Sequence, residues 1–354
     1  MRADDSVVFS KYFYNSFFFV ATLLFFIYNS TQMVYAWLIK KGEGEVQYMD
    51  LHSLLLKSCS TMRRYSENCT NDFLAHNNSS TTTHSPCCDW YHGAWQYLRV
   101  LDCVSAPQWH ESFYVDQLIE AIGSMDNSVS VLISGTADYS ILHLIVEAVK
   151  TSGKIIEIDI VDLCQTPLEI CKWYIEEFKR AEPQLFDRFS FRIFRRNIAL
   201  FDKGKRYDII CTDAFLTRFS SDEAQSVVEK WTKLLKASGR IITTVRVHSD
   251  IFQQTPSFTE ESRMVQKYIR KVRERYRKLT EEEMRLFGIT ENELSFLAAR
   301  YIIKIMSNPL GNVLDLKSLF SKSGLKIIES NSSVWEVVGE VDRTDYYQIV
   351  AVKE

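Results

Sequence analysis

The sequence predicts an α/β fold in which a mostly parallel sheet carries helices on both faces. From residue 128 onward, short runs rich in β-branched and aromatic residues alternate with amphipathic segments of helical length. The helical segments carry capping signals, and the last two runs are joined by a short connection. The predicted strands occupy residues 129–134, 154–162, 189–194, 207–213, 240–247, 325–333 and 345–353.

Helix start and stop signals support this alternation of strands and helices. The tetrapeptide SSDE at residues 220–223 has the capping-box pattern of a helix start, and the helix is expected to run through residues 224–237. Gly239 then supplies a stop before the next strand. The two C-terminal strands have only a short connection, so we expect them to pair antiparallel and to close one edge of the sheet.

A helical insertion of about residues 251–310 is expected after the fifth strand. Its first helix places six apolar or aromatic residues on one face, and the sequences TEEE and TENE open two further helices. The basic residues between positions 263 and 278 fall on the opposite side, so a solvated face is favoured over a nucleic-acid-binding helix. The six residues are Val265, Tyr268, Ile269, Val272, Tyr276 and Leu279.

Residues 1–127 are expected to form an N-terminal helical lid that covers the substrate, with a mobile loop near residues 67–88. The apolar run from Phe17 to Tyr28 is shorter than a membrane-spanning helix requires, and polar residues recur along one side of its continuation. A soluble helix is therefore favoured, and membrane association through residues 12–39 is the alternative.

The composition disfavours a dedicated nucleic-acid-binding protein, because 42 Lys and Arg residues are balanced by 45 Asp and Glu residues. The eight cysteines include no CxxC pair, which favours the reducing cytoplasm. A zinc site is disfavoured, since its candidate ligands lack paired spacings and two of them are adjacent in sequence. Those candidates are Cys69, His76, His84, Cys87 and Cys88.

Candidate binding residues stand where the first two predicted strands end. Gly135 follows the first strand, and in an open parallel sheet this turn approaches a cofactor most closely. The loop lacks the three spaced glycines that a pyrophosphate requires, which favours a cofactor with an adenosine and no phosphate. Asp162 ends the second strand, where a carboxylate can accept both ribose hydroxyls. A helix N-cap is the alternative role for Asp162.

Over residues 128–354 the sequence resembles the class I S-adenosylmethionine-dependent methyltransferases. The resemblance rests on the order of VLISGTADYS, VDLCQTPL, RRNIALF, YDIICTDAFL and LLKASGRIITTVRV, followed by the terminal strand pair. It implies a Rossmann-like seven-stranded sheet and S-adenosyl-L-methionine as cofactor, released as S-adenosyl-L-homocysteine. The loop departs from the family pattern, because Ile133 stands in place of an acid and Ala137 and Tyr139 in place of two glycines.

The resemblance also implies which residues contact the cofactor. In the glycine loop, Gly135, Thr136 and Ala137 would contact the methionine portion. At the end of strand two, Asp162 and Leu163 would contact the ribose. Asn197 and Ile198, before strand four, would contact the adenine, and Asp213, at the end of strand four, would lie beside the sulfonium.

Two aromatic-rich segments before the first strand, residues 90–99 and 107–114, are expected to cover the pocket. A protein base is needed for an acceptor nitrogen that is protonated near neutrality, whereas positioning can suffice for a neutral nucleophile. No metal is required. The candidate bases are His92, His110 and His248, each with a structural role as its alternative. The candidate substrate-binding residues are Tyr91, Trp95, Arg99, Tyr114 and Arg246.

We therefore expect a cytoplasmic methyltransferase that transfers a methyl group to a nitrogen or oxygen of a small molecule by direct in-line displacement. A nucleic-acid substrate is disfavoured, because strand four ends in TDAFL rather than in a tetrapeptide that receives a flipped base. The alternative function is a catalytically inactive cofactor-binding or partner-binding protein that has kept the fold.

Overall fold

The computed structural model describes residues 51–69, 88–247, 262–305, 313–336 and 343–353. All of them belong to one compact unit, Met49–Glu354. The expected apolar helix at residues 17–28 and the candidate base His248 lie outside the described residues. No helix within the described ranges is long and apolar enough to cross a membrane.

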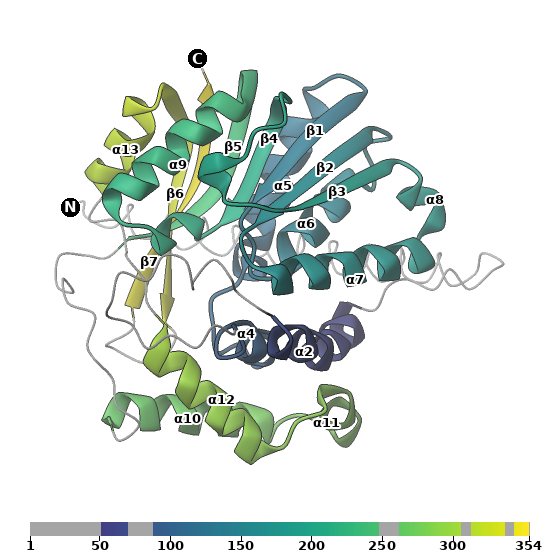
Figure 1. The fold of residues 1–354 in the computed structure, drawn as a ribbon, viewed down its shortest axis with the longest axis vertical. Helices are drawn as coiled ribbons and strands as arrows, with labels where there is room; N and C mark the ends of the chain where they lie inside the picture. The colour runs from purple at the N-terminus through teal and green to yellow at the C-terminus, as the bar shows by residue number, and fades with distance from the viewer. Residues whose placement is uncertain (1–50, 70–87, 248–261, 306–312, 337–342, 354) are drawn as a thin grey trace, which may run out of the picture. The chain divides into compact units, whose positions relative to one another are not determined.

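The fold is built on a seven-stranded sheet with the order β3-β2-β1-β4-β5-β7-β6 (Figure 1). The first five strands pair in parallel, whereas β7 runs antiparallel to both β5 and β6. The predicted mostly parallel, Rossmann-like sheet with an antiparallel C-terminal pair is confirmed. The strands are β1 (Ser128–Ser134), β2 (Ile155–Asp162), β3 (Phe189–Arg195), β4 (Tyr207–Asp213), β5 (Leu235–Val247), β6 (Leu325–Glu336) and β7 (Arg343–Lys353).

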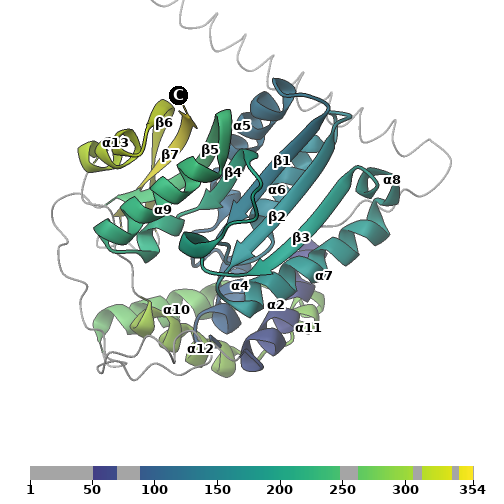
Figure 2. The ribbon, with the colours of Figure 1, turned by 45° about the horizontal axis from the view of Figure 1, so that its top comes forward.

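The two faces of the sheet contribute to separate cores, because successive side chains of a strand point in opposite directions. On β1, Val131 and Ile133 belong to the core under helices α5, α6 and α7, whereas Leu132 belongs to the core under α9 and α13. Both faces are therefore apolar at the centre of β1, which explains why Val131, Leu132 and Ile133 follow one another without a polar residue between them. Figure 2 shows the helices on the two sides of the sheet. They are α5 (Glu111–Gly123), α6 (Ser140–Val149), α7 (Gln165–Ala181), α9 (Ser221–Leu234) and α13 (Val313–Lys322).

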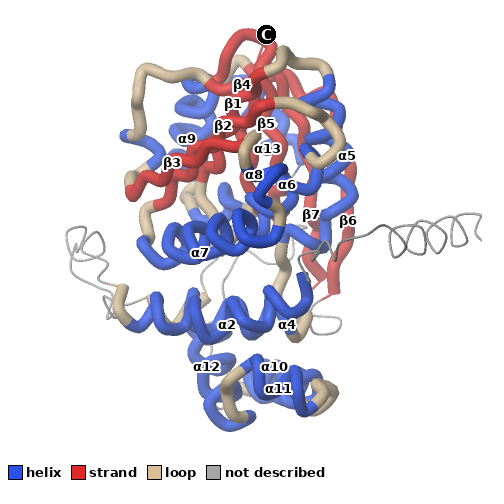
Figure 3. The backbone as a smooth tube through the Cα atoms, turned by 90° about the vertical axis from the view of Figure 1, so that its right-hand side faces the viewer, coloured by secondary structure: helices blue, strands red, loops and turns tan. Residues whose placement is uncertain are grey.

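A further set of helices lies beyond α7 (Figure 3). It combines N-terminal helices with those of the expected insertion after β5, and α12 contacts both α4 and α10. On α10, the apolar residues Val265, Tyr268 and Val272 are buried, and most of the basic residues are exposed, as the helical spacing predicted. The helices are α2 (Leu51–Glu67), α4 (His92–Val100), α10 (Arg263–Tyr276), α11 (Glu281–Phe287) and α12 (Glu291–Lys304).

The predicted capping boxes are present at the starts of α9, α11 and α12. The predicted helix through residue 237, with Gly239 as the stop before the strand, is wrong at its end, because α9 ends at Leu234 and β5 begins at the next residue. Residues 236–239 bulge between Leu235, which pairs with Tyr207, and Arg240, which pairs with Ile209. A Cβ atom at Gly239 would lie 3.1 Å from the carbonyl oxygen of Tyr207, so the glycine permits this close return of the chain.

Candidate functional site

A pocket of about 260 Å³ opens at the carboxyl ends of β1, β2 and β4. The sheet side is lined by Gly135, Asp162 and Asp213. The opposite side includes Tyr91 and Tyr301, which come from the segment before α4 and from α12. This is the edge at which open parallel sheets bind ligands, so the pocket is the candidate site.

Gly135 adopts a left-handed conformation with φ of 73°, and its N–H donates to the carbonyl of Val161 at 2.8 Å. A Cβ atom at this position would lie 2.2 Å from the ring of Phe215. Only glycine combines that backbone conformation with so close an approach. Phe215 belongs to the short helix η3 (Phe215–Arg218) after β4, so Gly135 also allows this aromatic ring to close over the loop.

Asp162 lines the pocket and holds the loop after β1. Its Oδ2 accepts from the backbone N–H of Thr136 at 2.9 Å, and its Oδ1 accepts from that of Cys164 at 2.7 Å. Burial raises the pKa of Asp162 to about 6, although the backbone N–H groups oppose the shift. Because a carboxylate oxygen has two lone pairs, each oxygen can still accept one further hydroxyl.

Asp213 ends β4 at the floor of the pocket. Its Oδ1 accepts from the hydroxyl of Thr244 at 2.6 Å and from that of Tyr114 at 3.0 Å. Burial raises the pKa of this carboxyl group, while His110 and the two hydroxyl donors oppose the shift. Tyr114 was expected to contact substrate, but it does not line the pocket, and its buried hydroxyl shares its one proton between Asp213 and the carbonyl of Thr212.

Arg99 was also expected to contact a ligand, and the structure pairs it instead with Asp138. Both side chains are almost fully buried, at 4% and 2% exposure, and Nε of Arg99 donates to Gln108 at 2.9 Å. Asp138 lines the pocket, and its Oδ1 also accepts from the N–H of Ser140 at the start of α6. Sequence reasoning missed Asp138, although an acid three residues after Gly135 was a visible signal.

Aromatic side chains form one wall of the pocket. The rings of Tyr91 and Tyr301 stack at a centroid distance of 5.8 Å, and Trp95 lies 5.7 Å from Tyr91. The guanidinium group of Arg218 lies 4.8 Å from the centre of the Tyr91 ring and donates to its hydroxyl at 2.6 Å. The predicted residues Tyr91, Trp95 and Arg246 line this pocket.

The two described candidate bases differ in position. His92 is buried and lines the pocket, and burial lowers its pKa to about 4. His110 is buried outside the lining, 5.2 Å from the ring of Tyr346, which does line the pocket. Burial also lowers the pKa of His110, and the Asp213 carboxylate opposes this shift. Both imidazoles are therefore stabilised in their neutral form.

Other predicted cofactor residues divide into two groups. Thr136 and Ala137 line the pocket together with Gly135. Outside the lining are Leu163, Asn197 and Ile198. The side chain of Asn197 accepts the N–H of Ala199 at 2.9 Å and caps the short helix η2 (Ile198–Leu200).

Several lining residues carried no signal in the sequence. They come from η3, α12 and β7, and no spacing rule brings these segments together before the chain is folded. A residue shortly after β4 could have been predicted to line the pocket, because this strand ends at the edge of the sheet where ligands bind. These residues are Phe215, Arg218, Tyr301 and Tyr346.

No family model and no curated protein matches the sequence. Among solved structures, the chain is similar to a magnesium protoporphyrin IX methyltransferase from Synechocystis PCC 6803 with bound SAM, at 9% identity and a TM-score of 0.42, over 75% of this chain and 94% of that chain. It is also similar to the N-methyltransferase NodS from Bradyrhizobium japonicum WM9, at 10% identity and a TM-score of 0.39, over 73% and 98% of the two chains. A third similar structure is the cyclase SpnF, at 12% identity and a TM-score of 0.44, over 71% and 83%. At these identities, the activity has to be argued from this chain's own residues.

Proposed function

We propose that the protein is an S-adenosylmethionine-dependent methyltransferase that acts on a small molecule. The observation that carries the proposal is Asp162, a pocket-lining carboxylate at the end of β2 that also hydrogen-bonds the loop containing Gly135. An adenosine-bearing cofactor needs a hydroxyl acceptor at this place, next to a loop that allows close backbone approach.

The donor set of the pocket fits this cofactor. Asp162 keeps one acceptor site on each oxygen for a pair of vicinal hydroxyls. Asp213 supplies a carboxylate that suits the positive charge of a sulfonium, whereas the Asp138 carboxylate, whose charge is paired with Arg99, can accept a hydrogen bond from an amino group. The ring of Phe215 offers an apolar surface beside the glycine loop. Because this cofactor carries no phosphate, the pocket does not need the three spaced glycines that bind a pyrophosphate.

S-adenosylmethionine supplies a methyl group on a positively charged sulfur, from which a nucleophile can take it directly. The residues of this chain have to align the acceptor, exclude water and keep the acceptor's lone pair available. Tyr114 and Thr244 fix the Asp213 carboxylate by two hydrogen bonds, so this charge is held in place before any ligand enters. The stacked rings of Tyr91 and Tyr301 line the opposite side, where an apolar surface would limit the access of water.

The acceptor would lie between this wall and the ends of β4 and β5. Arg218 and Arg246 line the pocket together with the phenolic side chains of Tyr301 and Tyr346. Guanidinium groups favour a ligand with an anionic group. We therefore propose an acceptor that carries a carboxylate or a comparable anion in addition to its nucleophilic nitrogen or oxygen.

The histidines favour an acceptor that is uncharged when it reacts. A general base works best when its pKa lies near the working pH, and burial lowers the pKa of His92 to about 4. His110 does not line the pocket. Among the described residues, positioning of a neutral nucleophile is therefore better supported than catalysis by a histidine base, whereas the candidate base His248 lies outside them.

The direct test is calorimetry of the full chain with S-adenosylmethionine and S-adenosylhomocysteine, followed by detection of S-adenosylhomocysteine release with small amines, alcohols and phenols, each with and without a carboxylate. Binding followed by turnover with an anionic acceptor is expected. Folded protein that binds neither cofactor form would overturn the proposal. Binding without turnover over the whole panel would favour the catalytically inactive cofactor-binding protein.

A further inference from the structure

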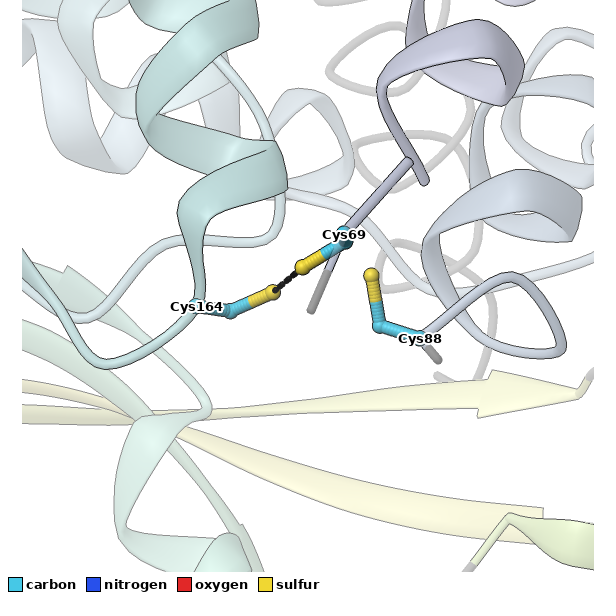
Figure 4. Close-up of side chains that lie close together, drawn as sticks. All are labelled: Cys69, Cys88 and Cys164. Carbon is cyan, nitrogen blue, oxygen red and sulfur yellow. Dashed lines mark hydrogen bonds between the residues drawn. The ribbon is translucent and has the colours of Figure 1, made fainter. Parts of the chain in front are cut away.

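Three cysteines from separate segments of the chain converge beside the pocket (Figure 4). Cys69 follows α2, Cys88 precedes α4, and Cys164 is the N-cap of α7, two residues after Asp162. All three are buried, with exposures of 5%, 6% and 8%. Their sulfur atoms lie within 4.8 Å of one another.

The spacing of these atoms suits a tetrahedral ion. The Sγ atoms of Cys69 and Cys164 are 3.7 Å apart. Two thiolates bound to zinc at about 2.3 Å in tetrahedral geometry are separated by about 3.8 Å. A disulfide, in contrast, requires about 2.05 Å and uses only two of the three sulfurs.

A nitrogen ligand stands next to one of the three sulfurs, and the His92 ring has to turn toward the other two to complete a four-ligand site, because among the described residues the set within 4.8 Å holds the cysteines alone. Nδ1 of His92 lies 3.5 Å from Sγ of Cys164. A zinc-bound nitrogen and a zinc-bound sulfur, at about 2.05 and 2.3 Å from the metal, are about 3.6 Å apart in tetrahedral geometry. His92 is buried, and burial favours the neutral imidazole that metals bind.

The surroundings also suit thiolate ligands. The hydroxyl of Thr166 lies 3.0 Å from Sγ of Cys88 and can donate a hydrogen bond to that sulfur. Hydrogen bonds of this kind orient and stabilise metal-bound thiolates. Three thiolates and one imidazole form a set that selects zinc over magnesium or calcium, which prefer oxygen ligands.

We propose that Cys69, Cys88, Cys164 and His92 bind one Zn²⁺ ion. Four protein ligands leave no open coordination position, so the ion is structural rather than catalytic. It would tie the end of α2 and the approach to α4 to the end of β2, and so hold one wall of the pocket against Asp162. His92 then serves as a ligand and not as a base.

This ligand set differs from the one disfavoured on sequence grounds. That set contained Cys69 and Cys88 but drew its other members from nearby residues. Cys164 is 95 positions away from Cys69 in sequence, so no local spacing could reveal it. Only the folded chain brings Cys164, which follows β2, close to Cys69 and Cys88.

The test measures metal in the full chain purified without chelator, and it requires neither cofactor nor turnover. We expect one zinc per chain by elemental analysis, and a cobalt-substituted protein with thiolate-to-metal charge transfer and the absorption of a tetrahedral site. Cys164→Ser and Cys88→Ser should each lower metal affinity by more than about 100-fold, which is more than the loss of a supporting hydrogen bond costs. His92→Gln should weaken binding and change the cobalt spectrum.

The matched control is Cys103→Ser, which removes a buried thiol outside the cluster whose Sγ donates to the carbonyl of Leu101. This variant should keep full metal content. Circular dichroism shows whether a variant that binds no zinc is still folded. In the wild-type protein, zinc should protect three thiols from alkylation until a chelator is added. Zinc-supplemented wild-type protein that binds no metal, or that holds a Cys69–Cys164 disulfide instead, would overturn the proposal.

Discussion

The backbone N–H of Thr136 donates to Oδ2 of Asp162 at 2.9 Å and joins the loop after β1 to the end of β2. The other carboxylate oxygen accepts from Cys164, at the start of α7. One side chain thus fixes two turns at the functional edge of the sheet and still faces the pocket. Its role in folding and its proposed role in binding can be separated by substitution.

Asp162→Ala should weaken S-adenosylmethionine binding by about 2 to 3 kcal/mol, because it removes a charge-assisted hydrogen-bond acceptor. It should also lower the free energy of unfolding by about 1 to 3 kcal/mol, since two backbone N–H groups lose their partner. Calorimetry and thermal denaturation measure the two effects. Asp187→Ala, at an exposed position after the short helix α8 (Pro183–Phe186), is the control and should change neither. Unchanged affinity in folded Asp162→Ala would remove Asp162 from the cofactor site.

The parts of this site that sequence could predict are those tied to a strand end. Gly135, Asp162 and Asp213 each end or directly follow a β-rich run, and a parallel sheet brings such positions to one edge. Phe215 and Tyr301 could not be predicted in the same way, because their places depend on how η3 and α12 pack. The bulge before Arg240 was missed for a related reason, since the end of a helix and the start of the next strand depend on pairing with β4.

Gly135→Ala should lower the free energy of unfolding by about 2 kcal/mol or more. The substitution places an L side chain in the left-handed region and drives its Cβ atom into the ring of Phe215. A double-mutant cycle with Phe215→Ala separates the two causes, because Phe215→Ala relieves the clash but not the backbone strain, and the single variant measures the lost packing against Phe219 and Trp231. Gly135→Ala/Phe215→Ala should recover part of the loss. Strict additivity of the two substitutions would show that the ring and the glycine do not constrain each other.

The buried pair of Arg99 and Asp138 should behave as a unit. Arg99→Met or Asp138→Ala alone should cost about 3 to 5 kcal/mol of unfolding free energy, because each leaves an uncompensated buried charge. Arg99→Met/Asp138→Ala should be more stable than the sum of the single losses predicts. Denaturant unfolding of the four proteins gives the coupling energy, and a value near zero would contradict the pairing.

The pH dependence of stability should include a contribution from His143, which lies on α6 away from the pocket lining. Burial lowers its pKa to about 4, with further lowering by Arg99 and Lys150, while Nδ1 hydrogen-bonds the hydroxyl of Tyr174 at 2.9 Å. A histidine with a depressed pKa stabilises the fold above its unfolded pKa of about 6.5, and this stabilisation is lost as the pH falls toward 4. The loss amounts to about 3 kcal/mol at pH 4.

His143→Gln removes this titration, so its free energy of unfolding should fall less steeply than that of the wild type between pH 6.5 and pH 4. Leu200→Gln, at an exposed and uncharged residue of η2, is the control and should keep the wild-type slope, because it removes no titratable group. Urea denaturation at several pH values gives the comparison. Parallel curves for wild type and His143→Gln would show that this imidazole titrates normally in the folded protein.

The last prediction concerns the chemical step. Because burial lowers the pKa of His92 to about 4, its protonation state does not change above about pH 5, and His110 lies outside the pocket lining. With an acceptor that is neutral from pH 7.5 to 9, a range above the Asp162 pKa of about 6, kcat should therefore be independent of pH, and His110→Gln should lose less than about 10-fold in kcat. A positioned base contributes about 10² to 10⁴ in rate, so a loss of that size, together with a displaced pH profile, would identify the residue as the base. The kcat of His92→Gln has to be compared with that of the wild type at equal zinc occupancy. The proposed loss of a zinc ligand would also loosen the pocket wall that the ion holds, and this alone could lower kcat. If kcat at full occupancy falls by 10² or more and rescue by added imidazole restores the profile, His92 is a base, and positioning of a neutral nucleophile is the wrong mechanism.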